Sequence, residues 1–365
     1  MSADILLRSV RLASGLVLLA FVTGHLCNLM LGLHSLAAME AARPWLMGPW
    51  RSAPGLALLA GAALVHIALG ITAIVRRRSL ALSRTDAVQL ALGLLTPPLL
   101  LEHAVVMHLA GEVTPDFHAA FGQMLAVYWS FSPRYAFQQL AVVMVVWMHG
   151  AIGLYSWLVL KPVWRRIGGL LLPLLFAVPI LALLGFAEAG KEVLERLAGD
   201  PAWRAQIVEN LNKVARVTRT YEGLRANLLM GYGALLLGAF ACLGWKILRQ
   251  RLRRVRVDYD GGLSAQARVG LSLLECSRLN HIAHAHVCSG RARCGTCRVR
   301  VEAGAAQLSP AAELEQRTLE RVGAAAGERL ACQARVLGAG VQVTRVLPAF
   351  ADASAARAPQ DWSPA

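Results

Sequence analysis

The sequence Cys288-Ser-Gly-Arg-Ala-Arg-Cys294-Gly-Thr-Cys297 places three cysteines within ten residues, and a fourth follows at Cys332 in Leu-Ala-Cys-Gln. The spacing is C-x5-C-x2-C, then 34 residues, then C. A [2Fe–2S] cluster needs four thiolates on two irons, and one loop can supply three of them. Glycines inside the loop let backbone N–H groups approach the sulfides. The motif therefore predicts a [2Fe–2S] cluster bound by Cys288, Cys294, Cys297 and Cys332.

Two other metal sites fit this pattern less well. A zinc ribbon is built on two C-x2-C knuckles, and this chain has one. A Rieske centre needs two cysteine–histidine pairs; His286 precedes Cys288, and no second pair follows. The other three cysteines, Cys27, Cys242 and Cys276, are expected to be small buried hydrophobic residues.

Residues 251–348 are expected to fold as an α+β domain around this motif. The sequence pattern predicts strands at 254–259, 266–270, 298–302 and 341–346, with a turn at 260–262 and helices at 271–278 and 309–323. Such a mixed sheet with helices over one face is a β-grasp arrangement. Residues 349–365 are small and polar, and we expect a flexible linker there.

The rest of the chain is apolar enough to lie in a membrane. The protein has 365 residues, of which 56% are hydrophobic and only 16% charged, unlike a soluble protein. Six apolar runs are long enough to cross a bilayer, at about 8–33, 54–75, 86–110, 136–160, 168–188 and 226–247. Residues 1–250 are therefore predicted to form a six-helix transmembrane bundle, with 188–225 as a helical loop outside the membrane.

Charge predicts how the spans are oriented. The formal net charge is +15, and the arginines gather at alternate ends of the apolar runs. That distribution is typical of the positive-inside rule rather than of a nucleic-acid-binding face. We expect a multi-pass protein of a bacterial inner membrane, with both termini and the cysteine domain in the cytoplasm, where thiolates stay reduced.

Four histidines recur through the first four spans. His25, His66, His108 and His149 are separated by 41, 42 and 41 residues, one on each span. By depth they pair as His25 with His108 and His66 with His149. Two haem b groups stacked in a four-helix bundle need that arrangement, because each iron takes one imidazole from each face of its porphyrin. The spacing therefore predicts two bis-histidine haems.

Alternatives remain open at the third span. His103 and His108 are five residues apart and cannot share a helix face. Depth would allow His103 as the partner of His25, whereas equal spacing favours His108. Histidines packed in a helical core are the simpler interpretation of any one of them. Glu102 is either a proton-path or quinone-binding residue or a neutral buried acid.

These features together resemble known families. The C-x5-C-x2-C motif resembles that of adrenodoxin-like ferredoxins. The first spans resemble the dihaem cytochrome b anchor of succinate dehydrogenases and fumarate reductases. An anchor followed by a ferredoxin resembles the N-terminal half of bacterial membrane-bound class III adenylate cyclases, over about residues 1–347. That resemblance implies haem ligation by the four histidines and cluster ligation by the four cysteines.

The resemblance also implies a redox function. We expect a sensor in which the quinone pool sets the state of two haems and of the cytosolic cluster, which regulates a cyclase output domain. Cyclases continue into a catalytic domain that residues 349–365 do not contain, so that domain would lie beyond this chain or in another one. The alternative is a quinone-linked oxidoreductase subunit with a soluble partner. Enzyme activity is left open, and a homodimer is plausible if a cyclase is the output.

Overall fold

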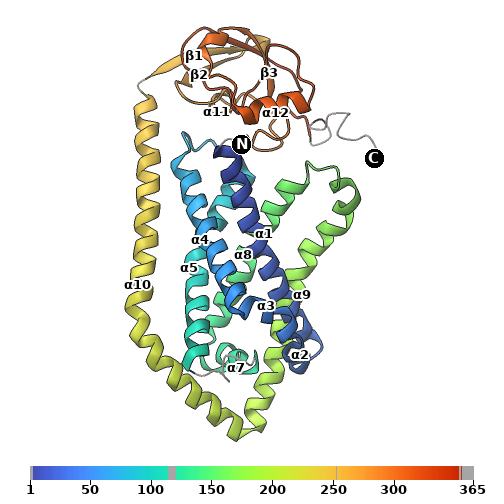
Figure 1. Cartoon of the computed structure of the whole chain (residues 1–365), viewed down its shortest axis with the longest axis vertical. Helices are drawn as coiled ribbons and strands as arrows, with labels where there is room; N and C mark the ends of the chain where they lie inside the picture. Colours follow the sequence, from blue (N-terminus) through green and yellow to red (C-terminus); the bar gives the residue numbers. More distant parts are fainter. Residues whose placement is uncertain (1–2, 114–120, 252, 353–354, 356–365) are drawn as a thin grey trace.

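The structure is a computed structural model that describes residues 3–113, 121–251, 253–352 and 355, without the side chains of 102, 105–113, 217–221 and 251. A helical bundle makes up the larger part, and a small sheet domain lies at the end of the bundle where α1 begins (Figure 1).

The first part of the bundle consists of long helices joined by short ones. In order they are α1 (Ala3–Met30), η1 (Leu31–Leu33), α2 (Leu36–Leu46), α3 (Gly48–Arg51), α4 (Ala53–Val75), α5 (Arg84–Val113), α7 (Phe121–Ala126), the π-helical turn η2 (Val127–Phe131) and α8 (Arg134–Leu158). Helix α1 packs on α4, and α5 packs on α8. Pro97 and Pro98 lie inside α5.

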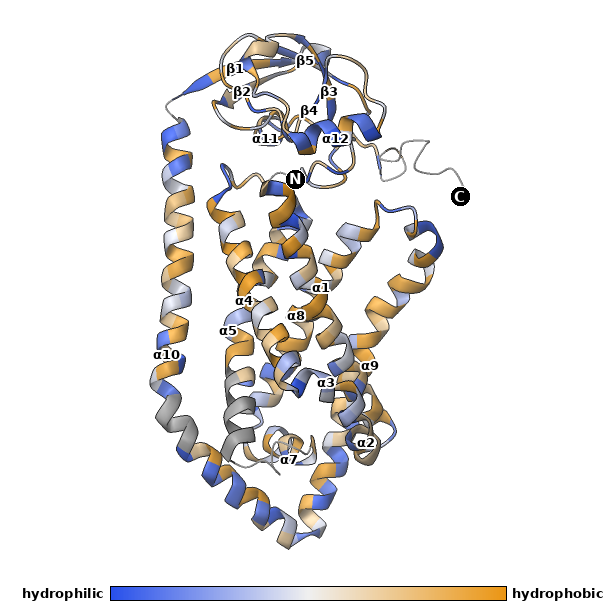
Figure 2. Cartoon of the chain, viewed as in Figure 1, coloured by the Kyte–Doolittle hydropathy of each residue, from blue (hydrophilic) through white to orange (hydrophobic). Residues whose placement is uncertain are grey.

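Among the residues that the structure describes, five helical segments are long and apolar enough to cross a membrane. They are Ala3–Leu33, Ala53–Val75, Arg134–Leu158, Trp164–Gly199 and Glu222–Gln250. Their apolar residues cover the middle of the bundle (Figure 2). The predicted third span falls in α5, part of whose side chains lie outside the described residues. The count of six therefore stays a prediction, whereas the membrane character of the helical part is supported.

Two very long helices close the bundle. Helices α9 (Trp164–Gly199) and α10 (Pro201–Arg251) have 36 and 51 residues. At 1.5 Å per residue they extend roughly 54 and 76 Å, beyond the roughly 30 Å of a bilayer core. Asp200 separates them and caps α10 by accepting a hydrogen bond from Trp203 N at 2.9 Å. The predicted helical loop at 188–225 is thus the tip of this hairpin (Figure 1).

Helix α9 crosses α1 with the backbones almost touching. A Cβ atom on Gly185 would lie 2.1 Å from the carbonyl oxygen of Leu29, so only glycine fits there. Around the crossing, apolar residues such as Leu26, Phe186 and Ile207 are buried in one cluster. This crossing fixes the hairpin against the far end of the bundle.

Helix α10 then returns along the bundle. Ala239 and Leu243 pack with Ile74 of α4, and the Tyr232 hydroxyl donates to the carbonyl of Leu94 at 2.9 Å. The return brings the C-terminal sheet domain back to the end where the chain began (Figure 1).

The sheet domain has five strands and two helices. Its elements are β1 (Arg254–Tyr259), η3 (Asp260–Gly262), β2 (Ser264–Arg268), α11 (Leu273–Leu279), β3 (Arg298–Ala303), η4 (Ala305–Gln307), α12 (Glu313–Arg321), β4 (Glu328–Leu330) and β5 (Val341–Arg345). The strand order is β2-β1-β5-β3-β4. Strands β1 and β5 run parallel, and the other pairs are antiparallel. This confirms the predicted mixed sheet; β2 begins two residues earlier than predicted, and β4 was not predicted.

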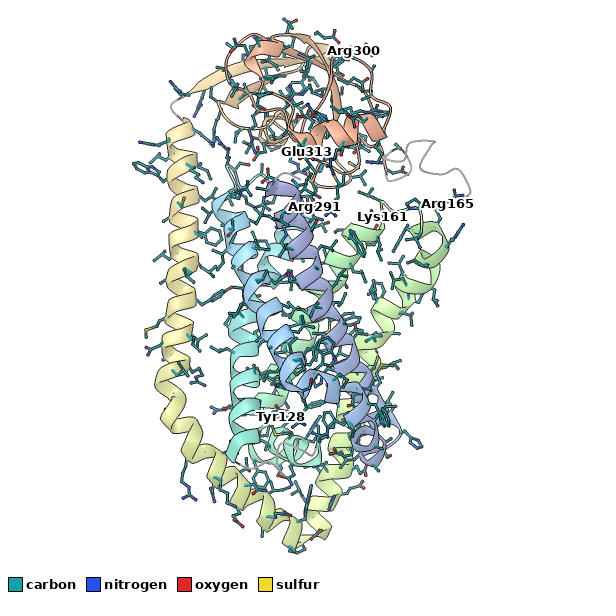
Figure 3. The ribbon with its side chains drawn as sticks, viewed as in Figure 1. Tyr128, Lys161, Arg165, Arg291, Arg300 and Glu313 are labelled. Atoms are coloured by element: carbon teal, nitrogen blue, oxygen red, sulfur yellow. The ribbon has the colours of Figure 1, made fainter. Side chains whose placement is uncertain are left out.

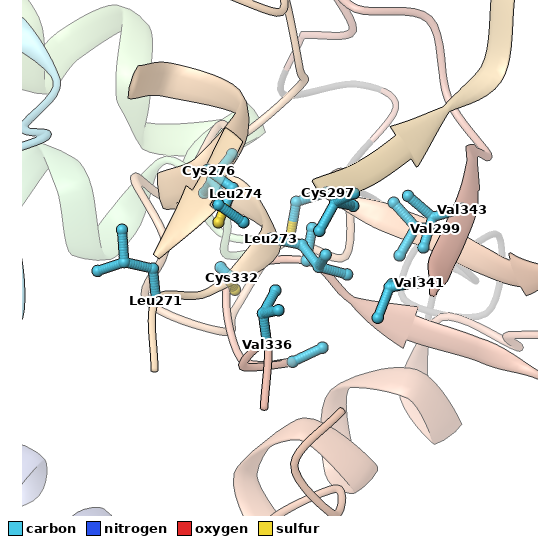
Figure 4. Close-up of a cluster of buried hydrophobic side chains, with 14 of the residues drawn as sticks. Leu271, Leu273, Leu274, Cys276, Cys297, Val299, Cys332, Val336, Val341 and Val343 are labelled. Carbon is cyan, nitrogen blue, oxygen red and sulfur yellow. The ribbon is translucent and has the colours of Figure 1, made fainter. Parts of the chain in front are cut away.

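The core of this domain lies between the sheet and α11. Val257 and Tyr259 point inward from β1, and Leu273 and Leu274 pack against them from the helix. Figure 4 shows Leu273 and Leu274 together with Cys276. Cys276 is fully buried, and burial raises the pKa of its thiol to about 12. It is a core residue, as its place on the helix predicted.

Candidate functional site

The cysteine loop (residues 281–297) leads from α11 into β3. A capping box fixes the start of α11: Ser272 Oγ accepts from Glu275 N at 3.2 Å, and Glu275 Oε2 accepts from Ser272 N at 2.9 Å. Further along, the backbone repeatedly adopts positive φ, at Ser289 (53°), Gly290 (84°), Ala292 (48°) and Gly295 (70°). Such left-handed residues turn neighbouring N–H groups toward one concave side, which suits a bound anion.

The four motif cysteines lie in two pairs. Cys288 interacts with Cys294, and Cys297 with Cys332. All four are buried, with at most 8% of their surface exposed. The Cys294 thiol and neighbouring backbone N–H groups hold the pKa of the Cys288 thiol below its usual value, although burial opposes this. The same contact and burial raise the pKa of the Cys294 thiol, so this pair favours one thiolate, at Cys288.

Further donors reach these sulfur atoms. Thr296 N lies 3.4 Å and Thr296 Oγ1 3.0 Å from Cys294 Sγ, and Gln333 Nε2 lies 3.4 Å from Cys332 Sγ. Among the described residues, no three His, Cys, Asp or Glu side chains converge as a single-ion site requires. Two pairs of thiols provide two ligands for each of two irons. The residues present thus fit a [2Fe–2S] cluster better than a zinc ion.

The same region matches a known family. The model of the 2Fe-2S iron-sulfur cluster binding domain matches residues 257–337, which include all four cysteines. This part of the chain is a [2Fe–2S] ferredoxin domain. The ferredoxin domain indicates electron transfer as its general function.

Individual proteins show the same likeness. Chlorosome protein I from Chlorobaculum tepidum is 36% identical over 77 residues, which are 21% of this chain and 32% of that protein. The chain thus spans about a third of the length of that relative. An ISC-like [2Fe–2S] ferredoxin from Pseudomonas putida is 27% identical over 26% of this chain and 94% of its own, with a TM-score of 0.24. Both likenesses are limited to a part of the chain no larger than the ferredoxin domain.

Within the bundle, His66 and His149 face each other. Their ring centroids are 6.1 Å apart, and the ring planes are perpendicular. His149 Nδ1 lies 3.0 Å from the carbonyl oxygen of Gln89, and His66 Nδ1 lies 3.2 Å from Ser14 Oγ. A carbonyl can only accept, so His149 carries its proton on Nδ1 and has a free lone pair on Nε2. We call these two residues the inner pair.

A second pair of histidines lies farther from the ferredoxin domain than the inner pair does. The rings of His25 and His103 are 6.3 Å apart and inclined by 53°. Both Nδ1 atoms are buried and have no hydrogen-bond partner among the described residues. The structure thus brings His25 to His103, the alternative partner, and we call these residues the outer pair. The side chains of His108 and Glu102 lie outside the described residues, so both assignments stay predictions.

Two glycines make room beside the inner pair. A Cβ atom on Gly93 would lie 2.8 Å from His149 Cε1, and one on Gly15 would lie 3.0 Å from His66 Cε1. Neither glycine was predicted from the sequence to lie at a site. A spacing in the sequence could have identified them: Gly15 precedes His25 by ten residues, and Gly93 precedes His103 by ten. That shared spacing relates α1 to α5 and would have favoured His103 over His108.

The cysteine loop rests on the end of the bundle nearest the inner pair. Leu160, two residues after α8, packs with Cys288 and Cys294. Arg291, between these two cysteines, points down to the bundle (Figure 3) and forms an ion pair with Asp86 of α5 at 2.8 Å. This contact could not be predicted from the sequence, since Arg291 and Asp86 are 205 residues apart.

Proposed function

We propose that this chain is a membrane electron-transfer protein that connects redox carriers in the bilayer with a [2Fe–2S] cluster at the membrane surface. The ferredoxin domain supports the cluster, and we assign its ligands as Cys288, Cys294, Cys297 and Cys332. The two histidine pairs support haem as the carrier within the bundle. Quinone is proposed as the diffusible carrier, because the bundle offers apolar surface to lipid.

The spacing of the inner pair supports a haem there. A metal–imidazole bond is about 2 Å long, so two imidazoles on opposite sides of one iron have ring centres roughly 6 Å apart. The distance of 6.1 Å between His66 and His149 fits this requirement. Ligand histidines usually donate their other N–H to a neighbour, as His149 does to Gln89. This pair is the observation on which the proposal chiefly rests.

The outer pair supports a second haem. Its spacing of 6.3 Å is equally suitable, and four-helix bundles carry such cofactors between facing helices. We therefore propose His25 and His103 as ligands, in place of the equal-spacing choice of His108. Their unpartnered Nδ1 atoms distinguish them from the inner pair.

The protein's own residues prepare the inner site for its cofactor. Gln89 and Ser14 hold the Nδ1 atoms, which directs Nε2 toward an iron. Gly15 and Gly93 leave space for both rings. Two b-type haems, when bound, would supply one-electron carriers within the bundle. The cluster supplies a further one-electron carrier in the ferredoxin domain.

The output of the protein is proposed from resemblance. A cyclase domain regulated by the state of the cluster is our first choice, and a soluble redox partner is the second. The bundle would in either case exchange electrons with the quinone pool of the membrane.

Haem content tests the bundle. Purified protein should bind two haem b per chain by the pyridine haemochrome assay, and His66→Leu should lower this to one because the inner iron loses a ligand. His34→Leu is the matched control, since His34 is exposed and belongs to neither pair. Two haems in His66→Leu, or none in the unchanged protein, would refute the haem assignment.

Paramagnetic resonance tests the cluster. Cys294→Ser should remove the signal of the reduced [2Fe–2S] cluster and leave the haem bands in place. Cys242→Ser serves as the control, because Cys242 lies on α10 outside the motif. An undiminished cluster signal in Cys294→Ser would contradict the ligand assignment.

A further inference from the structure

Arg291 connects the cysteine loop with the bundle through both its side chain and its backbone. Its Nη2 atom donates to Asp86 Oδ1 at 2.8 Å and to Gln89 Oε1 at 3.1 Å. Its carbonyl oxygen accepts from Arg8 Nη1 at 2.6 Å. One residue of the loop is thus held by two helices, α1 and α5.

Gln89 continues this connection to the inner pair. Its side chain accepts from Arg291, while its own carbonyl oxygen accepts from His149 Nδ1. Only one residue therefore lies between the guanidinium of the loop and an imidazole of the bundle. A Cβ atom on Gly153 would come within 3.1 Å of Gln89 Nε2, so the packing around this side chain is close.

Asp86 strengthens the contact. It is 9% exposed, and its other oxygen, Oδ2, accepts from Ser83 Oγ at 2.8 Å. The Ser83 hydroxyl lies 3.0 Å from Ser289 Oγ, in the turn after Cys288. The loop is therefore tied to the start of α5 at two points, and loss of Arg291 would leave a buried carboxylate without its ion-pair partner.

The apolar side of the contact involves the cysteines themselves. Leu160 packs with Cys288 and Cys294, and the helix that precedes it, α8, also carries His149. Gln89 of α5 and Leu160, just after α8, thus contact the same loop, and His149 of α8 contacts Gln89. The pair Cys288 and Cys294 is thus already in contact with the bundle.

We propose that Arg291, acting through Gln89, is the positioning residue that couples the cysteine loop to His149. Asp86 holds the guanidinium in place for this role. The inference rests on the proposed function, since it assumes carriers at both sites. Exchange between those carriers moves one electron and makes or breaks no bond, so its rate depends on how closely and how rigidly the two sites are held.

Three variants of the full-length protein test this role. Arg291→Gln removes the charge, Arg291→Lys keeps the charge without the forked geometry, and Asp86→Asn weakens the pair from outside the loop. Arg300→Gln is the matched control, because Arg300 is exposed on the far side of the ferredoxin domain (Figure 3). For each variant we would measure haem content, the cluster signal and the midpoint potential of each haem. The rate of cluster reduction is measured after mixing with a reduced water-soluble naphthoquinone.

We expect Arg291→Gln to keep both cofactor types while cluster reduction slows by roughly tenfold to a hundredfold, as small misplacements do. The potential or the low-spin signal of one haem should shift, which a purely structural contact would not cause. Arg291→Lys should be intermediate, Asp86→Asn slow, and Arg300→Gln unchanged. If Arg291→Gln loses its cluster, the rate of cluster reduction in Asp86→Asn decides whether the proposed role of Arg291 holds.

Rates within twofold of the unchanged protein in Arg291→Gln or, if that variant loses its cluster, in Asp86→Asn would overturn the role of Arg291. Haem and cluster would still be present in that case, and the proposed function would stand. An unchanged protein that binds no haem or no cluster would instead overturn the proposed function itself.

Discussion

A single hydrogen atom in place of a methyl group decides the geometry at Gly93. The missing side chain lets His149 lie against α5, where its Nδ1 atom reaches the carbonyl of Gln89. In Gly93→Ala the new Cβ would overlap with Cε1 at 2.8 Å, so the ring must move. We expect haem content to fall from two toward one per chain, or the low-spin haem signal to shift.

The matched control is Gly61→Ala on α4, where nothing lies within 4 Å of the added methyl group. Alanine favours a helix by roughly 1 kcal/mol over glycine, so this variant should be at least as stable as the unchanged protein. Equal haem content and spectra in the two variants would contradict the role of Gly93.

At the same scale, the spacing of the histidines along the sequence could not decide whether His103 or His108 is the partner of His25. Equal separations of about one helix plus one connection favoured His108, but such a count is insensitive to how far a helix is rotated. The contact between His25 and His103 depends on rotation. By contrast, the four cysteines could be found from the sequence, because three are local and the motif of the fourth, Leu-Ala-Cys-Gln, is specific.

Among the elements, the turn between β1 and β2 is held to β5 by one ion pair. Arg345 donates to Asp260 from its backbone N at 3.0 Å, from Nε at 2.9 Å and from Nη2 at 2.8 Å. These contacts lower the pKa of Asp260 to about 2. Asp260→Asn should destabilise the ferredoxin domain by about 1 kcal/mol, since the pair is partly exposed. Thermal loss of the visible cluster absorbance measures this.

The pH dependence follows from the direction of that pKa shift. The pKa of Asp260 is lower in the folded protein than the ordinary 3.8. The ion pair therefore contributes its full stabilisation of the folded domain above pH 3.8, and this stabilisation is lost as pH falls toward 2. The difference between Asp260→Asn and the unchanged protein should therefore stay constant from about pH 5.5 to about pH 8. A difference that changes across this range would mean that another group titrates with the pair.

The elements themselves could be predicted unequally well. Alternating apolar residues identified β1, and the capping residues at Ser272 and Glu275 mark α11. Strand β4 has three residues, Glu328–Leu330, and was missed because so short a stretch shows no periodicity. The continuous hairpin of α9 and α10 was expected only in part. Residues 188–225 were predicted to be helical, but as a separate loop rather than as continuations of the two flanking spans.

For the whole molecule, the decisive feature is which parts share an end. The start of α1 and the ferredoxin domain lie together, and the tip of the α9–α10 hairpin lies at the opposite end (Figure 1). Composition could predict the spans and their charge bias, but contacts such as that between Arg8 and Arg291 join distant parts of the chain and could not be read from local patterns. The arginine-rich end should face the cytoplasm.

Labelling of introduced cysteines tests this orientation. Gln206 lies on the hairpin and Gln316 on α12, and both side chains are exposed. In right-side-out vesicles, a membrane-impermeant maleimide should label Gln206→Cys and leave Gln316→Cys unlabelled; inverted vesicles should give the reverse. The unchanged protein supplies the background from its native cysteines. Labelling of both variants from one side would mean that the two ends do not lie across a membrane, and the proposed route from the bilayer to a cytoplasmic cluster would then lose its physical basis.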